Sequence, residues 1–152
     1  MYYTAQEIAE IAVRIEENGH DFYIAAAEMT ENENVKKMFL GLAQKEESHI
    51  AAFKHLLSKV EFEHTEFDLE SSGDYLQHQA DTHIFQKKDS GKILAASITN
   101  SKEAIKIAHQ FEIESVEFYT SLLKRVQSNA KNMVANIIEE EKQHAKELEA
   151  FL

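Results

Sequence analysis

Glu46-Glu47-Ser48-His49 is the stretch around which the rest of the chain is interpreted, because Glu46 and His49 lie three residues apart and share one side of a helix. The residues around them recur in alternating steps of four and three, the spacing of one helix face. That face is formed by Val35, Phe39, Leu42, Glu46, His49, Phe53 and Leu56. The pattern predicts a helix that points a carboxylate and an imidazole into the core. Burying both is unfavourable unless a cation satisfies them, which indicates a metal ion.

The same spacing recurs in Glu141-Lys142-Gln143-His144, 95 residues further along the chain. Here too the polar pair interrupts an apolar helix face at one place. That face is formed by Ala130, Val134, Ile137, Glu141, His144, Leu148 and Phe151. A single Glu-x-x-His is common on solvated helix surfaces and would carry little weight. Two copies with matching faces indicate an internal repeat.

Composition limits both the fold and the class of function. The 152 residues include no proline and four glycines, which favours long uninterrupted helices in one domain over residues 1–152. The net charge of −11 opposes binding to nucleic acid or to anionic membranes. The absence of cysteine excludes disulfides, iron–sulfur clusters and Cys-ligated zinc within these residues. No signal-peptide pattern or bilayer-length apolar run is present, so a cytoplasmic location is expected.

The first half of the sequence predicts a helical hairpin over residues 4–59. Thr4-Ala5-Gln6-Glu7 has the form of a capping box, so a helix should begin near Ala5 and end near Met29. Turn and capping residues follow over 30–34. The second helix, which carries Glu46 and His49, should then run over about residues 33–59.

A comparison of heights tests whether the two helices of this hairpin bring their polar residues together. Glu16 is the single acid on the inner face of the first helix, and the small Gly19 follows one turn later. In an antiparallel hairpin, residues at one height are equally distant from the turn. The midpoint of 16 and 46 is 31, which falls inside the predicted turn. Glu16 is therefore expected to face Glu46 and His49.

Residues 60–99 are expected to form a crossover connection, because periodicity weakens there and turn-forming residues accumulate. A short helix is predicted over about residues 74–86. The connection is long enough to return along the bundle, so the next helix would run parallel to the second. The histidines of this segment, His64, His78 and His83, are expected at the surface.

The second half of the sequence predicts a matching hairpin over residues 100–152. Asn100-Ser101-Lys102-Glu103 repeats the form of the first capping box, so a third helix should begin there. Its inner face is formed by Ile105, Ala108, Glu112, Ser115 and Tyr119, where Glu112 corresponds to Glu16 and Tyr119 to Tyr23. The midpoint of 112 and 141 is 126.5, which places the second turn near residues 126–129. The fourth helix is expected over about residues 129–150.

Together the hairpins predict an all-α, antiparallel four-helix bundle with approximate two-fold symmetry. Six side chains then meet at one level as candidate metal ligands: Glu16, Glu46, His49, Glu112, Glu141 and His144. Four carboxylates balance two dications, and a set rich in oxygen with two imidazoles suits iron or manganese. Without metal the carboxylates would repel one another and take up protons. The alternative is a plain bundle whose acids and histidines are solvated or serve as polar groups at an interface.

Four further residues lie close to this predicted level. Tyr23 and Tyr119 are candidates for hydrogen bonds to the site carboxylates or for redox-active side chains, and core tyrosines satisfied by one hydrogen bond are the simpler interpretation. His20 and His109 lie about one turn from the acids. They are interpreted as surface residues or as outer partners of the site, and not as metal ligands.

The pattern resembles that of the rubrerythrin branch of the ferritin-like di-iron carboxylate proteins, over nearly the whole chain. The matching residues are Glu16 with Tyr23, Glu46 with His49, Glu112 with Tyr119, and Glu141 with His144. The resemblance implies a ferritin-like bundle that holds two iron ions, with manganese or a mixed pair as alternatives. It implies that Glu46 and Glu141 bridge the metals, and that each histidine binds one. Glu16 and Glu112 would be terminal ligands, and the protein would be a homodimer.

The chain departs from this family in two respects. Rubrerythrins usually carry a rubredoxin-like domain with four cysteines that supplies electrons, and these residues include none, so an external electron donor protein is expected. Rubrerythrins also have an extra Glu one turn after the third-helix ligand, where this chain has Ser115. The resemblance implies a di-iron oxidoreductase that reduces hydrogen peroxide or dioxygen. An iron-binding or ferroxidase protein for sequestration or delivery, and a metal-free interaction module, are the alternatives.

Overall fold

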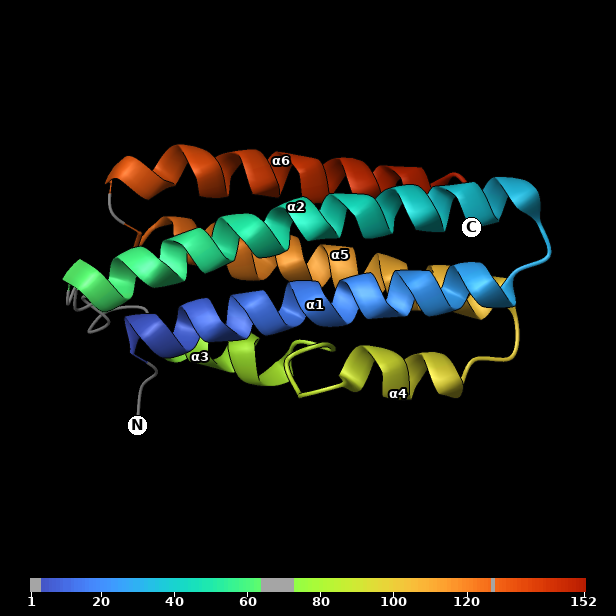
Figure 1. The fold of residues 1–152 in the computed structure, drawn as a ribbon, viewed down its shortest axis with the longest axis horizontal. Helices are drawn as coiled ribbons and strands as arrows, with labels where there is room; N and C mark the ends of the chain where they lie inside the picture. Colours follow the sequence, from blue (N-terminus) through green and yellow to red (C-terminus); the bar gives the residue numbers. More distant parts are fainter. Residues whose placement is uncertain (1–3, 64–72, 127) are drawn as a thin grey trace.

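The structure of the protein is a computed structural model that describes residues 4–63, 73–126 and 128–152. Those residues form six helices and no strand: α1 (Ala5–Met29), α2 (Glu33–Glu63), α3 (Gly73–Thr82), α4 (Ser90–Ala96), α5 (Ser101–Leu123) and α6 (Ser128–Glu149). The four long helices α1, α2, α5 and α6 form a bundle, and α3 and α4 lie along one side of it (Figure 1). This arrangement confirms the predicted all-α four-helix bundle.

Each helical hairpin pairs consecutive helices of the bundle. α1 packs against α2 and α5 against α6, and the hairpins meet where α1 contacts α5 and α2 contacts α6. α2 and α5 run in the same direction, because the chain returns along the bundle through α3 and α4 before α5 begins (Figure 1). The first turn occupies residues 30–32, and the second lies between Leu123 and Ser128. Both turns lie where the midpoints predict them.

Local capping explains where the first helix of each hairpin begins. The Thr4 side chain accepts a hydrogen bond from the Glu7 amide at 3.2 Å, and the Glu7 carboxylate accepts one from the Thr4 amide at 2.7 Å. Asn100 caps α5 by accepting from the Glu103 amide at 2.9 Å. The Glu103 carboxylate, however, accepts from the Thr99 amide at 3.3 Å. The first capping box is thus complete, and only half of the second forms.

The ends of two predicted elements differ from the structure. α2 continues to Glu63, beyond the predicted end near residue 59, because no proline or glycine interrupts it. The short crossover helix α3 ends at Thr82, earlier than predicted, and α4 is an additional helix. Phe151 is 41% exposed because it follows the end of α6, so its assignment to the buried face was wrong.

Asn18 of α1 forms three hydrogen bonds with the crossover between Phe85 and Gly91. Its side-chain amide donates to the backbone carbonyls of Phe85 and Lys87, both at 2.8 Å, and its side-chain oxygen accepts from the Gly91 amide at 3.3 Å. A Cβ atom on Gly91 would lie 2.0 Å from the backbone carbonyl oxygen of Asn18, so only glycine allows this close approach. The residues between α3 and α4 are therefore held against α1.

In the described ranges, no helix has an apolar segment long enough to cross a membrane.

Candidate metal centre

The six predicted ligands lie together in the middle of the bundle. Glu16 comes from α1, Glu112 from α5, and the two Glu-x-x-His pairs from α2 and α6. Each of the six residues is at most 3% exposed. The interpretation of these residues as a solvated helix surface is therefore wrong, because all of them face the core.

The ligand atoms of these residues form two overlapping groups of four. One group is Glu16, Glu46, His49 and Glu141, and the other is Glu46, Glu112, Glu141 and His144. In each group one nitrogen or oxygen atom per residue lies within 4.8 Å of the others. Glu46 and Glu141 belong to both groups. The arrangement is therefore that of two adjacent cation positions with two carboxylates in common.

The shared carboxylates direct different oxygens toward the two histidines. Glu46 places Oε2 3.8 Å from Nδ1 of His49 and Oε1 3.5 Å from Nδ1 of His144. Glu141 places Oε1 3.2 Å from Nδ1 of His49 and Oε2 3.0 Å from Nδ1 of His144. The imidazole rings stack with centroids 5.8 Å apart. Both Nδ1 atoms thus point into the cluster.

Several buried atoms of the cluster have no hydrogen-bond partner. They are Oε2 of Glu16, both carboxylate oxygens of Glu46, Nδ1 of His49, Oε2 of Glu112 and Oε1 of Glu141. A buried polar atom without a partner is costly, and nearly all of these are lone-pair donors. Cations at the two positions would satisfy them. The donor set therefore fits a pair of divalent metal ions.

The carboxylates show the expected cost of gathering charge inside the bundle. Burial raises the pKa of Glu46 and Glu112 well above the usual range, and the charges of Glu16 and Glu141 add to the effect. Burial also raises the pKa of Glu141. For Glu16, burial raises the pKa, but the neighbouring Glu46 carboxyl, the His49 imidazole and the Tyr119 hydroxyl outweigh it, and the pKa falls to about 2. The metal-free cluster therefore retains protons, as predicted.

The two histidines act as the cations of the metal-free cluster. Burial opposes their charge, but the neighbouring carboxylates of Glu112, Glu141 and Glu46 raise the pKa of His144 to about 12. Burial likewise opposes the charge of His49, and the nearby carboxylates of Glu141, Glu16 and Glu46 raise its pKa above the usual range. Metal binding must displace these protons, because only a neutral imidazole nitrogen binds a metal.

Tyr23 and Tyr119 link the two hairpins through the cluster. The Tyr23 hydroxyl on α1 donates to Oε1 of Glu112 on α5 at 2.5 Å. The Tyr119 hydroxyl on α5 donates to Oε1 of Glu16 on α1. Each tyrosine thus orients the acid of the opposite hairpin and leaves its second oxygen free. The predicted hydrogen bonds to site carboxylates are confirmed.

His83 was predicted at the surface, and the structure shows that this is wrong. It is 3% exposed and lies edge-on to the rings of Phe111 and Phe118. Its Nδ1 accepts from the Phe85 amide at 3.1 Å, so Nε2 carries the proton and donates to Oγ of Ser115 at 3.0 Å. Burial lowers the pKa of His83 to about 3. The periodicity of a connecting segment gives no signal for this contact.

The other described histidines lie outside both ligand groups. Nε2 of His20 is 3.2 Å from Glu47 on α2, and Nε2 of His109 is 3.0 Å from Glu149 on α6. About a quarter of each histidine side chain is exposed, which agrees with the interpretation of these residues as outer residues. His78 is exposed as predicted, and His64 lies outside the described residues.

Sequence reasoning also missed Glu140. Its carboxylate contacts the ring nitrogen of His49 that points away from the cluster, at 2.7 Å. A signal existed in principle, because residue 140 directly precedes a predicted ligand and lies on the neighbouring face of α6. No rule of spacing, however, relates it to a histidine on another hairpin.

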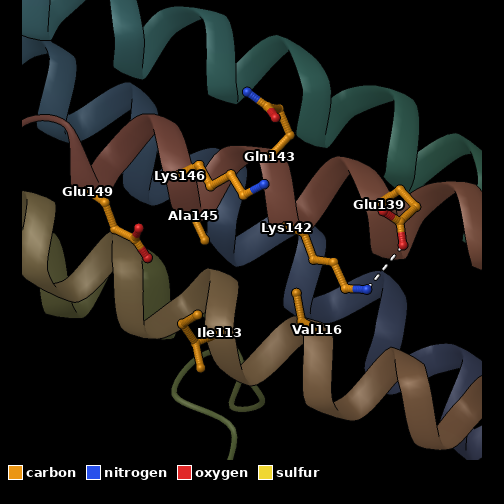
Figure 2. A pocket seen from close by; sticks show the side chains of 8 residues that line it. All are labelled: Ile113, Val116, Glu139, Lys142, Gln143, Ala145, Lys146 and Glu149. Carbon is orange, nitrogen blue, oxygen red and sulfur yellow. Dashed lines mark hydrogen bonds and ion pairs between the residues drawn. The ribbon is translucent and has the colours of Figure 1, made fainter.

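A groove of about 310 Å³ lies on the outside of the bundle between α5 and α6. Ile113 and Val116 come from α5, while Glu139 and Lys142 form an ion pair along the α6 side of the groove (Figure 2). None of the six candidate ligands lines it. The groove is therefore separate from the metal centre.

Comparisons with known proteins agree with this geometry. The family model described as Rubrerythrin matches residues 7–152. A solved structure from Thermotoga maritima, described as a ferritin-like diiron-carboxylate protein, is 28% identical and superposes with a TM-score of 0.68. The match covers 97% of this chain and 93% of that chain. No curated protein matches.

Proposed function

Because the chain belongs to the rubrerythrin family, we propose that its buried cluster holds two iron ions and that the protein is a di-iron oxidoreductase. The observation that carries the proposal is the pair of overlapping ligand groups that share Glu46 and Glu141. In the proposed assignment Glu46 and Glu141 would each hold both metals. Glu16 with His49, and Glu112 with His144, complete the two positions.

When bound, a ferrous pair supplies two electrons, which with two protons convert hydrogen peroxide to two molecules of water. An external donor protein returns the electrons. The residues of the chain bind and orient the metals, and the apolar bundle around them limits the access of water. Tyr23 and Tyr119 hold Glu112 and Glu16 in place through hydrogen bonds, so that the free oxygen of each acid faces the cluster. Dioxygen is the second oxidant that we consider.

Stopped-flow spectroscopy of the anaerobic protein tests this proposal. The protein is loaded with two equivalents of ferrous iron and mixed with hydrogen peroxide and a reducing partner. Repeated consumption of peroxide supports the oxidoreductase. Diffraction at the iron absorption edge, on the same preparation, reports whether two ions lie between the six residues. Iron elsewhere, or none, contradicts the assignment of the site.

A second candidate function is iron binding or ferroxidase activity for sequestration or delivery. The observation that favours it is the absence of cysteine from these 152 residues, which therefore contain no rubredoxin-type site that could supply electrons to the cluster. In the stopped-flow experiment, a single oxidation that stalls in the presence of reductant would support this candidate. A metal-free interaction module would show no bound metal and no thermal shift with ferrous ion.

A further inference from the structure

The two halves of the candidate centre differ in how their histidines are held. His49 on α2 is 2% exposed, and its Nε2 lies 2.7 Å from Oε2 of Glu140 on α6. The Glu140 side chain is about half exposed, at 48%. This contact joins the two hairpins from outside the cluster. It therefore fixes the ring of His49 from the side opposite to the metal.

The contact determines which nitrogen of His49 is available to a metal. A carboxylate only accepts hydrogen bonds, so Nε2 of His49 must carry the proton that it shares with Glu140. The lone pair of the neutral ring is then on Nδ1. That atom lies 3.2 Å from Glu141 and 3.5 Å from Glu16, and it has no hydrogen-bond partner. Glu140 therefore presents His49 in the tautomer that binds a cation at the cluster.

No residue in the described part of the chain supports His144 in the same way. The repeat places Lys45 at the position that corresponds to Glu140, 95 residues earlier, and Lys45 is exposed. Among the described residues, none forms a hydrogen bond with Nε2 of His144, whose Nδ1 faces the cluster. The six candidate ligands are thus arranged with approximate symmetry, whereas the residues beside the two histidines, Glu140 and Lys45, differ. Within residues 4–63, 73–126 and 128–152, a carboxylate contacts the outer nitrogen of His49 but not that of His144.

We propose that Glu140 is a positioning residue that makes the metal position on the His49 side the tighter of the two. The proposal rests on the proposed function, since it requires a metal at the cluster. A carboxylate that accepts the distal N–H of a ligating histidine fixes its orientation and increases its basicity. Loss of such a partner typically lowers metal affinity about 10- to 100-fold. The two metals are therefore bound in sequence, with the His49 position filled first.

Anaerobic titration with ferrous iron, followed by calorimetry, tests this inference on the full chain. The wild type is expected to bind two ions in two resolved steps. Glu140→Gln keeps the size of the side chain and removes the charge, and it should weaken the tighter step about 10- to 100-fold while the weaker step stays unchanged. The matched control is Glu139→Gln, which removes the same charge from the adjacent exposed residue, paired with Lys142 at 3.1 Å. It should leave both steps unchanged.

Thermal unfolding of the metal-free variants provides the structural check, and both should melt close to the wild type because residues 139 and 140 are partly solvated. Glu140→Ala should reproduce the loss of the tighter step. Equal weakening of both steps, or an equal effect of Glu139→Gln, would overturn the inference. So would two ions bound in the wild type and in Glu140→Gln with the same affinities, which would leave the proposed function intact. A wild type that binds no iron would refute both.

Discussion

Glu46 and Glu141 illustrate how a single residue is specified by its surroundings. Each is fully buried, and each turns one oxygen toward His49 and the other toward His144. A carboxylate oriented in this way offers one oxygen to each of the two candidate cation positions. Glu16 and Glu112 instead place one oxygen against a tyrosine of the opposite hairpin. The same residue type therefore has two geometries within one cluster.

This difference gives a prediction at the scale of the residue. Glu46→Ala or Glu141→Ala should abolish tight binding of two metals, because each substitution removes one carboxylate oxygen from each of the two metal positions. Metal content after anaerobic loading and desalting measures the effect, with fewer than two irons per chain expected. Glu47→Ala is the control, since that side chain is 65% exposed and lies outside the cluster. If both buried variants retained two irons, the bridging assignment would be wrong.

At the scale of the element, the crossover contributes more than a connection. Its residues between α3 and α4 are held by Asn18, and they place His83 against the α5 side chain of Ser115. α4 itself packs against α1 through Gly91. A segment with weak periodicity thus becomes ordered by tertiary contacts rather than by its own helix propensity.

Two glycines allow a matched test of this packing. Gly91→Ala should destabilise the protein by about 1–3 kcal/mol, because its Cβ would meet the Asn18 carbonyl oxygen at 2.0 Å. Gly41→Ala, in the middle of α2, meets nothing within 4 Å and should stabilise by about 0.5–1 kcal/mol through helix propensity. Urea unfolding compares the two. Equal effects of both substitutions would show that the crossover is not held closely against α1.

His83 gives a pH-dependent prediction for the same element. Burial lowers its pKa to about 3 in the folded protein from the ordinary histidine value of 6.5, so between these pH values the unfolded chain binds a proton that the folded protein does not. The contribution of His83 to stability is therefore present above pH 6.5 and is lost as pH falls. His83→Gln keeps a donor for Ser115 and cannot be protonated. From pH 7 to pH 5, the unfolding free energy of the wild type should therefore fall by about 2 kcal/mol relative to that of the variant.

Urea midpoints at pH 7, 6 and 5 measure that difference. The neighbouring charge of Glu16 acts on His83 in the direction opposite to burial, and it is present in both proteins. The acids of the metal centre titrate in both proteins as well, so the comparison cancels their contribution. A difference that stayed constant with pH would mean that His83 is accessible to water in the folded protein.

At the scale of the whole molecule, the two hairpins enclose a cluster that is poorly satisfied without cations. The unpartnered atoms come from all four long helices, so a ligand at the centre connects every element of the bundle. Its binding energy then adds to the stability of the complete fold. The same argument explains why the cluster retains protons in the absence of metal.

Metal loading should therefore raise the melting temperature. Ferrous iron at a hundred times its Kd would add about 2.7 kcal/mol per site, or roughly 5–10 °C for a domain of this size. Anaerobic thermal unfolding, monitored by circular dichroism, measures the shift. Glu46→Ala should show little of it, which separates binding at the cluster from binding at surface acids. An equal shift in that variant would locate the stabilising iron elsewhere.

The sequence alone determined the bundle and the level of its centre. Period-3.6 faces, capping residues and turn midpoints are local properties, and repetition after 95 residues made weak signals consistent with one another. They correctly predicted four long helices and the convergence of the acids near His49 and His144. The termini of α2 and α3 were less accurate, because helix ends depend on contacts beyond the segment.

Only the tertiary structure decided the contacts between hairpins. Three kinds of contact each connect residues more than 30 positions apart. They are the hydrogen bond between His83 and Ser115, the hydrogen bonds of Tyr23 and Tyr119 to the acids of the opposite hairpin, and the contact between Glu140 and His49. No periodicity encodes such pairs, because a helix face fixes the direction of a side chain and not the atom it meets on another helix. The similarity of the two halves and the substitution of Glu140 for Lys45 between them can be read from the sequence, while the contact between Glu140 and His49 is decided by packing.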